Sequence, residues 1–225
     1  RMGFAVLLVP ALLALITLTI ARSLFPRPQD LEVKTVALQA RGFTRTYWLY
    51  LGAVGLVAAG YADFPLMAYH FGKQQLVSSS HIALFYALAM GVDAVGALAL
   101  GRLFDRIGFG TLVLATLISV GFAPLAFLGG FFGAVTGAIL WGLGMSAQES
   151  VMRAAVARLI PPERRGTGYG VFHTGYGLAW FAGSALMGWL YDRSVIALVA
   201  FSVIAQMAAL AVFIVLARSH NRHLA

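Results

Sequence analysis

Several ionisable residues lie inside long apolar stretches, where charged side chains are costly and usually serve a function. Asp93 is 11 residues into the apolar stretch 82–102, which places it near the middle of a membrane-spanning helix. A lone carboxylate at that depth favours its protonated form unless a cation meets it, as a proton-coupling group requires. The alternative is a neutral acid that hydrogen-bonds a neighbouring helix.

A second carboxylate, Asp63, precedes Phe64 and Pro65 in the outer third of the apolar stretch 46–69. Pro65 cannot donate a backbone hydrogen bond and frees the carbonyl of Tyr61, which predicts a kink beside the carboxylate. Such a kink can form a substrate entrance or be a simple helix bend, and the sequence leaves both interpretations open.

Three further residues could carry a charge within apolar stretches. Glu149 and Arg153 stand four residues apart, which on an α-helix puts both side chains on one face and lets them pair. We therefore expect a structural ion pair near the cytoplasmic end in preference to a direct substrate contact. His173 could titrate near neutral pH, but its neighbours Thr174 and Tyr176 favour a hydrogen-bonded packing role.

Enzymatic chemistry has no support in the sequence. The chain has no cysteine, which excludes disulfides and thiolate ligands, and His70 and His81 lack the spacing of metal ligands. No phosphate-binding loop or nucleophile elbow is found either. We therefore predict no catalytic residue, no cofactor and no metal site.

The elements that position these residues are predicted to be membrane-spanning helices. Of 225 residues, 60% are hydrophobic and 11% are charged, and a helix needs about 20 apolar residues to cross a bilayer. The predicted fold is an all-α polytopic bundle embedded in a lipid bilayer, with about seven spans. They are expected at 2–21, 46–69, 82–102, 109–129, 132–157, 167–190 and 195–217.

The distribution of positive charge predicts the orientation. The chain carries 16 Lys and Arg against 8 Asp and Glu, and 12 of the basic residues fall in one alternating set of connectors against 2 in the other. Cytoplasmic connectors retain the positive residues, so the C-terminus is expected in the cytoplasm. Because no basic face interleaved with aromatic residues is present, nucleic-acid binding is not expected.

The most specific motif is Gly-Arg-Leu-Phe-Asp-Arg-Ile-Gly at residues 101–108. Gly101 permits close helix approach, Asp105 can bond a helix N-terminus or an arginine, and Gly108 permits a sharp reversal. With Arg102 and Arg106 included, the motif resembles the loop signature of the major facilitator superfamily, where it latches the two halves of a transporter. Phe109 and Gly110 replace the basic residues of the fullest signature, which suits the weaker copy in the family's C-terminal half.

A second stretch, residues 159–170, resembles the loop before the family's eleventh helix. The resemblance implies that residues 1–22 are the sixth helix, 23–45 the central cytoplasmic loop, 46–217 the six-helix C-terminal bundle and 218–225 a cytoplasmic tail. Within 23–45, a short surface helix capped by Asp30 is expected. The chain would then be part of a longer protein, with a further N-terminal helical bundle as its partner.

The resemblance also implies a function. The complete protein would be a secondary transporter in the cell (inner) membrane, moving a small-molecule solute by alternating access, with coupling to protons as a further hypothesis. Residues 188–193 echo 101–106, as an inverted repeat would produce, although they can also simply end a helix. Glycines at 170, 175, 177, 183 and 188 suit either moving helices or static packing.

Two other classes of protein are alternatives to a transporter. A self-contained seven-helix receptor or light-driven protein is the main alternative, but a retinal protein needs a lysine in its last span and 195–217 contains none. A membrane-embedded enzyme or assembly factor would need a catalytic constellation that the sequence lacks.

Overall fold

The computed structural model describes residues 2–24 and 42–221, and the chain divides into two units at residues 37 and 38. The first unit contains α1 (Met2–Leu24), an apolar helix of 23 residues with Arg22 in its last turn. At about 1.5 Å per residue, a helix of this length can cross a bilayer. The predicted surface helix from Leu31 to Phe43, with Asp30 as its cap, lies mostly outside the described residues.

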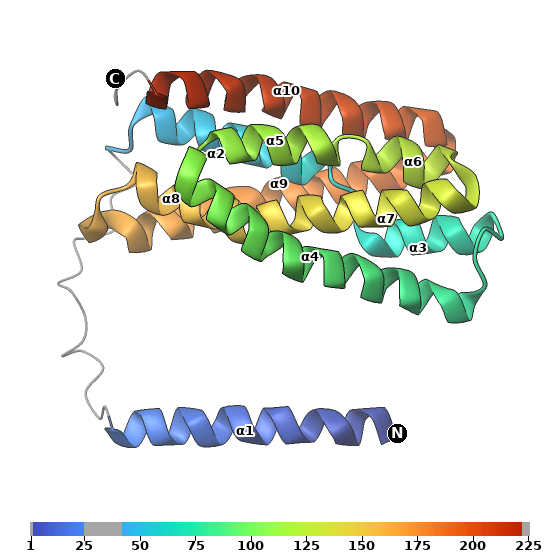
Figure 1. Cartoon of the computed structure of the whole chain (residues 1–225), viewed down its shortest axis with the longest axis horizontal. Coiled ribbons are helices and arrows are strands. Elements are labelled where there is room, and N and C mark those ends of the chain that lie inside the picture. The colour runs from blue at the N-terminus through green and yellow to red at the C-terminus, as the bar shows by residue number, and fades with distance from the viewer. Residues whose placement is uncertain (1, 25–41, 222–225) are drawn as a thin grey trace. The chain divides into compact units, whose positions relative to one another are not determined.

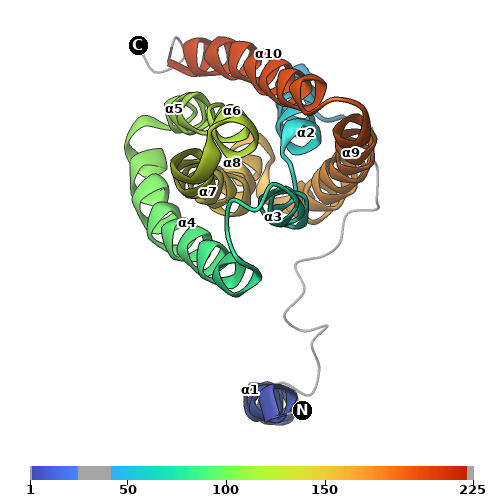
Figure 2. The same ribbon diagram turned by 90° about the vertical axis from the view of Figure 1, so that its right-hand side faces the viewer.

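The second unit is a bundle of helices that run along a common direction, as Figures 1 and 2 show. Its α-helices are α2 (Arg45–Gly60), α3 (Phe64–Lys73), α4 (Ser79–Ile107), α5 (Gly110–Ser119), α6 (Phe122–Leu128), α7 (Gly130–Ser146), α8 (Met152–Leu159), α9 (Arg165–Arg193) and α10 (Val195–Asn221). A π-helical turn, η2 (Ala147–Val151), joins α7 to α8, and a 3₁₀ turn, η3 (Pro162–Arg164), precedes α9.

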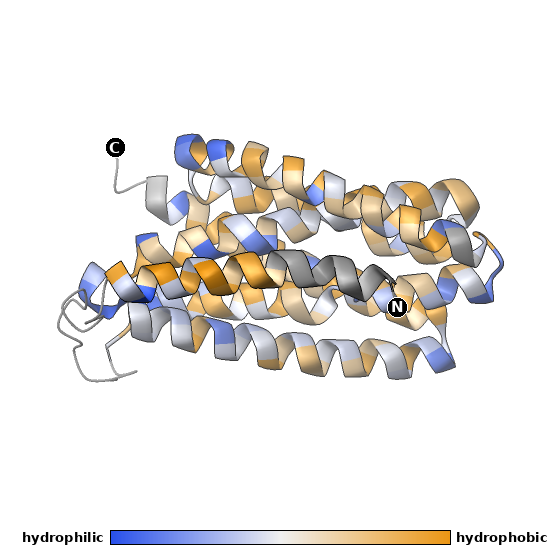
Figure 3. Cartoon of the chain, turned by 90° about the horizontal axis from the view of Figure 1, so that it is seen from below, coloured by the Kyte–Doolittle hydropathy of each residue, from blue (hydrophilic) through white to orange (hydrophobic). Residues whose placement is uncertain are grey.

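Within the described residues, five helical stretches are long and apolar enough to cross a membrane. They are Arg45–Lys73, His81–Ile107, Gly110–Leu128, Gly130–Leu159 and Val195–Ser219. Figure 3 shows apolar residues along the helices and hydrophilic ones gathered toward their ends. The remaining two predicted spans correspond to α1 and to α9, which is long but carries more glycine and polar residues. The predicted all-α polytopic fold is confirmed.

Two of the predicted spans are interrupted helices, and a third contains the π turn η2. The prediction of a kink at Pro65 understated the change, because residues 61–63 leave the helical conformation and α3 starts anew with Asp63 as its N-cap and proline in its first turn. A proline is well tolerated in a first turn, where its missing N–H is not needed. Another break, at Val120 and Gly121, precedes Pro124, which cannot bond the carbonyl four residues back.

Close approach of the helices depends on a few glycines. A Cβ atom added at Gly142 of α7 would collide with the backbone of Ala89 in α4, and one added at Gly183 of α9 would collide with the backbone of Ala59 in α2. Small residues at such points let backbones pack in contact, as is common between membrane helices. They bring α4 and α9 against the elements that carry the predicted site.

Candidate functional site

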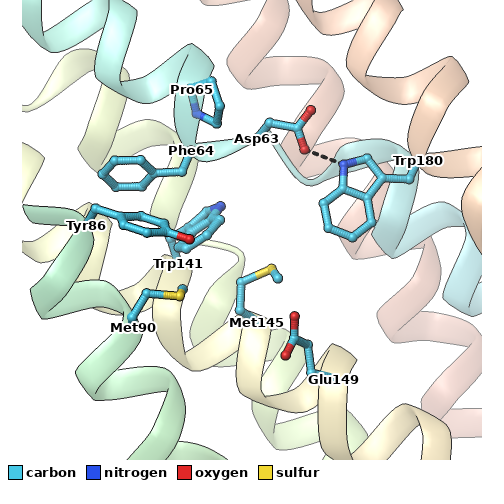
Figure 4. Close-up of a pocket in the computed structure, with 9 residues that line it drawn as sticks. All are labelled: Asp63, Phe64, Pro65, Tyr86, Met90, Trp141, Met145, Glu149 and Trp180. Atoms are coloured by element: carbon cyan, nitrogen blue, oxygen red, sulfur yellow. Dashed lines mark hydrogen bonds between the residues drawn. The ribbon is translucent and has the colours of Figure 1, made fainter. Parts of the chain in front are cut away.

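A cavity with a volume of about 460 Å³ lies beside the break between α2 and α3 (Figure 4). Its walls come from the break and α3, from α4, from α7 with η2, and from α9. The lining residues are Asp63, Phe64, Pro65, Tyr86, Met90, Trp141, Met145, Glu149 and Trp180. Seven of these nine are apolar or aromatic and two are carboxylates.

Hydrogen bonds from other helices hold the break open. The indole Nε1 of Trp141 donates to the carbonyl of Ala62 at 2.8 Å, and the Ser202 hydroxyl donates to the carbonyl of Gly60 at 2.6 Å. The Tyr61 hydroxyl donates in turn to the backbone carbonyl of Trp141. Buried backbone groups outside a helix need such partners in a bilayer. The break is therefore a built feature of the bundle.

Asp63 is held at the mouth of α3 by two donors on α9. The Trp180 indole N–H donates to its Oδ1, and the Ser184 hydroxyl donates to its Oδ2 at 2.6 Å. Both donors are neutral, so they orient the half-buried carboxylate and leave its negative charge uncompensated. The sequence analysis found Asp63 but missed Trp180 and Ser184, which are more than 115 residues away along the chain.

Glu149 lies on the π-helical turn and faces the same cavity (Figure 4). The Met152 N–H bonds the carbonyl of Ala147, five residues back, which is the hydrogen bond of a π-helix. Single π turns inside α-helices are frequent at functional sites. The spacing of apolar residues in the sequence does not reveal this π turn.

The predicted ion pair between Glu149 and Arg153 is not formed. Among residues 42–221, the one ion pair within 4.0 Å joins Arg158 to Asp105. The prediction assumed continuous α-helix, whereas the π turn changes the angle per residue between the two side chains. Glu149 instead lines the cavity, and a direct contact with a substrate stays a prediction.

Tyr176 contacts a neighbour of each cavity carboxylate, Gln148 beside Glu149 and Trp180 beside Asp63. Its hydroxyl donates to Oε1 of Gln148 at 3.1 Å, next to Glu149 on the π turn, and its ring packs edge-on against Trp180 with centroids 5.3 Å apart. Positions 169, 173, 176, 180 and 184 recur at helical spacing, so one stripe of α9 carries both contacts. This stripe was not anticipated.

Asp93 is a half-buried member of a mostly buried stripe of α4. The stripe consists of Phe85, Ala89, Asp93, Gly96, Leu100 and Phe104 and packs toward α7, where Gly96 contacts Ser146. The Oδ1 atom of Asp93 is buried and has no hydrogen-bond partner among the described residues, and the carboxylate interacts electrostatically with Glu149. Asp93 is not among the residues that line the cavity.

His173 lies on α9 and is exposed within the chain. Its ring stacks on Tyr169, with centroids 6.3 Å apart, and meets Phe172 edge-on at 5.3 Å. The expected hydrogen bond of His173 is not found among the described residues, and its contacts are aromatic. The structure does not bring His173 to the cavity wall that Asp63 and Glu149 share.

The 101–108 motif forms the turn between α4 and α5. Gly108 adopts a φ of +56°, a region that favours glycine. Arg158 of α8 reaches this turn, with its Nη2 atom 3.5 Å from Oδ1 of Asp105 and its guanidinium 4.1 Å above the Phe104 ring. Arg106 is exposed, and Arg102 donates to the Leu98 carbonyl at 3.3 Å. Asp105 thus forms an ion pair with an arginine, which is one of the two kinds of partner that the sequence allowed for it.

The fold and the cavity together define a polytopic helical membrane protein with a pocket sized for a small solute. Residues 49–224 match the Major Facilitator Superfamily, and the chain belongs to that family. The family consists of transporters, not enzymes.

Sequence similarity to known relatives extends over most of the chain. Uncharacterized proteins of Mycobacterium bovis and of two strains of Mycobacterium tuberculosis are each 34% identical over 214 residues, which cover 92% of this chain. The chain spans about half the length of these curated relatives, since the matched region is 52% of each.

Proposed function

We propose that the chain supplies one half of a secondary transporter that moves a small solute by alternating access. The cavity at the broken helix carries the proposal, because secondary transporters place their solute site near the bilayer midplane, typically at interrupted helices. Residues 46–217 act as the six-helix C-terminal bundle, 1–22 as the sixth helix, 23–45 as the central loop and 218–225 as the tail. An N-terminal bundle of the complete protein closes the other side of the cavity.

The exposure of the cavity residues supports this division. Glu149 and Tyr86 line the cavity yet remain exposed in the isolated chain, so one side of the site has no wall of its own. A second bundle placed against that side completes the enclosure. Rocking of one bundle against the other then opens the site to each side of the membrane in turn.

The loop 101–108 fits a conformational role in this scheme. Gly101, Arg102, Asp105, Arg106 and Gly108 lie at the end of the bundle where the α4–α5 and α8–α9 connectors meet (Figure 1). Arg158 ties this turn to the connector before α9 through Asp105. We assign the turn to the inner side of a cell (inner) membrane, in agreement with the excess of basic residues there.

Cysteine accessibility tests the proposal without knowledge of the solute. The 225 residues contain no cysteine. The protein is expressed from its complete reading frame, and any cysteines elsewhere in that frame are replaced. Tyr86→Cys then gives a single reporter inside the cavity. A membrane-impermeant maleimide should label it in both right-side-out and inverted vesicles, because the site alternates between the two sides.

Three control positions calibrate the labelling. Gln74→Cys at one end of the bundle and Glu163→Cys at the other should each be labelled from one side only, and the fully buried Ala134→Cys from neither. Labelling of Tyr86→Cys from one side alone, under all conditions, would contradict alternating access and favour a self-contained receptor. The end positions also test the proposed orientation, with Glu163 expected inside.

A further inference from the structure

We propose that the cavity selects lipophilic organic cations, an inference that rests on the proposed function of the same site. The charge of the lining is the first observation. Both charged lining residues, Asp63 and Glu149, are acidic, and none of the nine lining residues is basic. They approach the space from different elements, the start of α3 and the π turn (Figure 4).

The negative charge of these groups is not neutralised within the described residues. Asp63 accepts from an indole and a hydroxyl, both neutral, and Glu149 has no ion pair within 4.0 Å in residues 42–221. Asp93 adds a third carboxylate close enough to interact electrostatically with Glu149. Like charges held together in a medium of low polarity are unfavourable, and a bound cation offsets that cost.

Arg153 is a basic residue four positions after Glu149 in the chain. Its charge acts on Tyr176, and its backbone carbonyl accepts a hydrogen bond from Tyr169. It does not line the cavity. The space between Asp63 and Glu149 is therefore left without a positive charge of its own.

The apolar part of the wall indicates an organic cation. Phe64 lies with its ring centroid 4.8 Å from that of Tyr86 and 5.5 Å from that of Trp141, so three aromatic rings form one side. Trp180 stands on the opposite side in Figure 4. Aromatic faces attract cations, and the thioethers of methionine adapt to apolar groups of varied shape.

A hydrated metal ion suits this wall poorly. Hard cations require six or more oxygen ligands, whereas the lining offers two carboxylates among apolar side chains. Anions meet repulsion from the same carboxylates. A cation whose charge is spread over or shielded by apolar groups satisfies both parts of the cavity.

A competition assay tests the inference on the purified protein from its complete reading frame. Radiolabelled tetraphenylphosphonium is the probe, and binding is followed by scintillation proximity at neutral pH. Benzyltrimethylammonium, benzyl alcohol and benzoate compete as a cation, a neutral molecule and an anion on one benzyl scaffold. The cation should compete at least ten times more strongly than the other two.

Variants of the two carboxylates identify the site. Asp63→Asn and Glu149→Gln should each weaken tetraphenylphosphonium binding about tenfold or more, while Glu149→Asp retains most of it. Asp192→Asn and Glu163→Gln remove exposed carboxylates away from the cavity and should leave binding unchanged. Size-exclusion profiles and retained maleimide labelling of Tyr86→Cys show that a variant is folded.

Equal or stronger competition by benzyl alcohol or benzoate would overturn the inference, as would undiminished binding in folded Asp63→Asn and Glu149→Gln proteins. These failures differ from a failure of the proposed function. If Tyr86→Cys is labelled from both sides but cations do not compete best, the proposed transport function stands and the solute belongs to another class. Cation binding with one-sided labelling keeps the binding inference and rejects alternating access.

Discussion

The indole N–H of Trp180 donates a hydrogen bond to the carboxylate of Asp63, joining the middle of α9 to the break between α2 and α3. Ser184, one turn further along α9, donates to the other carboxylate oxygen at 2.6 Å. The two bonds fix the position of the carboxylate at the cavity wall. They also tie the start of α3 to α9, so that the broken segment cannot drift away from the bundle.

Removal of either donor should destabilise the bundle. Trp180→Phe keeps a ring and loses the N–H, and Ser184→Ala loses only the hydroxyl. A hydrogen bond to a charged group contributes about 1.5–3 kcal/mol, and each variant should lose a free energy of unfolding of about that size or less. Titration with a denaturing detergent, followed by tryptophan fluorescence or circular dichroism, measures the loss.

A double-mutant cycle isolates the Trp180 contribution. In an Asp63→Asn background the effect of Trp180→Phe should shrink, because the bond is then to a neutral amide. Equal losses in both backgrounds would show that the indole stabilises α9 by packing alone, for instance against Tyr176.

The glycines of α9 should differ sharply in their tolerance of alanine. A Cβ at Gly183 would collide with the backbone of Ala59, whereas positions 177 and 188 have nothing within 4 Å. Gly183→Ala should therefore cost about 1–3 kcal/mol of stability through overpacking. Gly177→Ala and Gly188→Ala should be neutral or slightly stabilising in the isolated chain, since alanine favours helix.

Thermal denaturation of the four proteins in one detergent checks this ranking. If Gly183→Ala has the same melting temperature as the parent, α2 and α9 do not pack in backbone contact. The result also separates the two interpretations of these glycines that the sequence left open. Position 183 is predicted to serve packing, and positions 177 and 188 are free for contact with a moving partner.

The main features of the fold were predictable because the bilayer imposes strong rules on sequence. Runs of about 20 apolar residues and the placement of arginines identified the helical segments, and Pro65 marked the break. These signals are local, so a single sequence carries them in full. The loop 101–108 is local too, and its turn was predicted with the right glycine at the reversal.

The composition of the site was harder to predict because it depends on contacts between distant segments. Trp180 and Trp141 are ordinary apolar residues in their own helices, and only packing shows that their N–H groups meet Asp63 and Ala62. The π turn at Glu149 likewise has no periodic signature, and it redirected a side chain expected to pair with Arg153. The sequence identifies ionisable residues by their type, but it does not identify the side chains that bond them in the folded protein.

The contact between Arg158 and the α4–α5 turn should be stabilised more by stacking than by charge. The Asp105 side chain is 80% exposed, and exposed ion pairs contribute only about 0.2–1 kcal/mol. The guanidinium also lies 4.1 Å from the centroid of Phe104. Asp105→Asn should therefore cost little stability, and Arg158→Ala clearly more.

Melting temperatures at low and high salt distinguish the two contributions. The small effect of Asp105→Asn should vanish at 1 M salt, where charges are screened within about 3 Å, whereas most of the Arg158→Ala loss should remain. Arg158→Lys keeps the charge and should lie between them. A loss in Arg158→Ala that disappears with salt would assign the contact to charge instead.

Asp93 offers the clearest separation of stability from function. Its buried Oδ1 atom has no partner among the described residues, so the carboxylate is tolerated in the α4 stripe without compensation. Asp93→Asn keeps the shape and removes an ionisable group beside Glu149. The variant should melt at the same temperature as the parent or above it, because a neutral amide cannot acquire a charge next to a second carboxylate.

If Asp93 couples transport to protons, the same variant should lose proton-driven uptake of tetraphenylphosphonium into proteoliposomes while it retains exchange of internal for external probe. Exchange needs only the alternation of the cavity, whereas net uptake against a gradient needs a group that takes up and releases a proton. Glu163→Gln, an exposed carboxylate outside the bundle interior, serves as the control and should keep both activities. Intact proton-driven uptake in Asp93→Asn would remove Asp93 from the coupling mechanism and leave it a purely structural residue of the stripe.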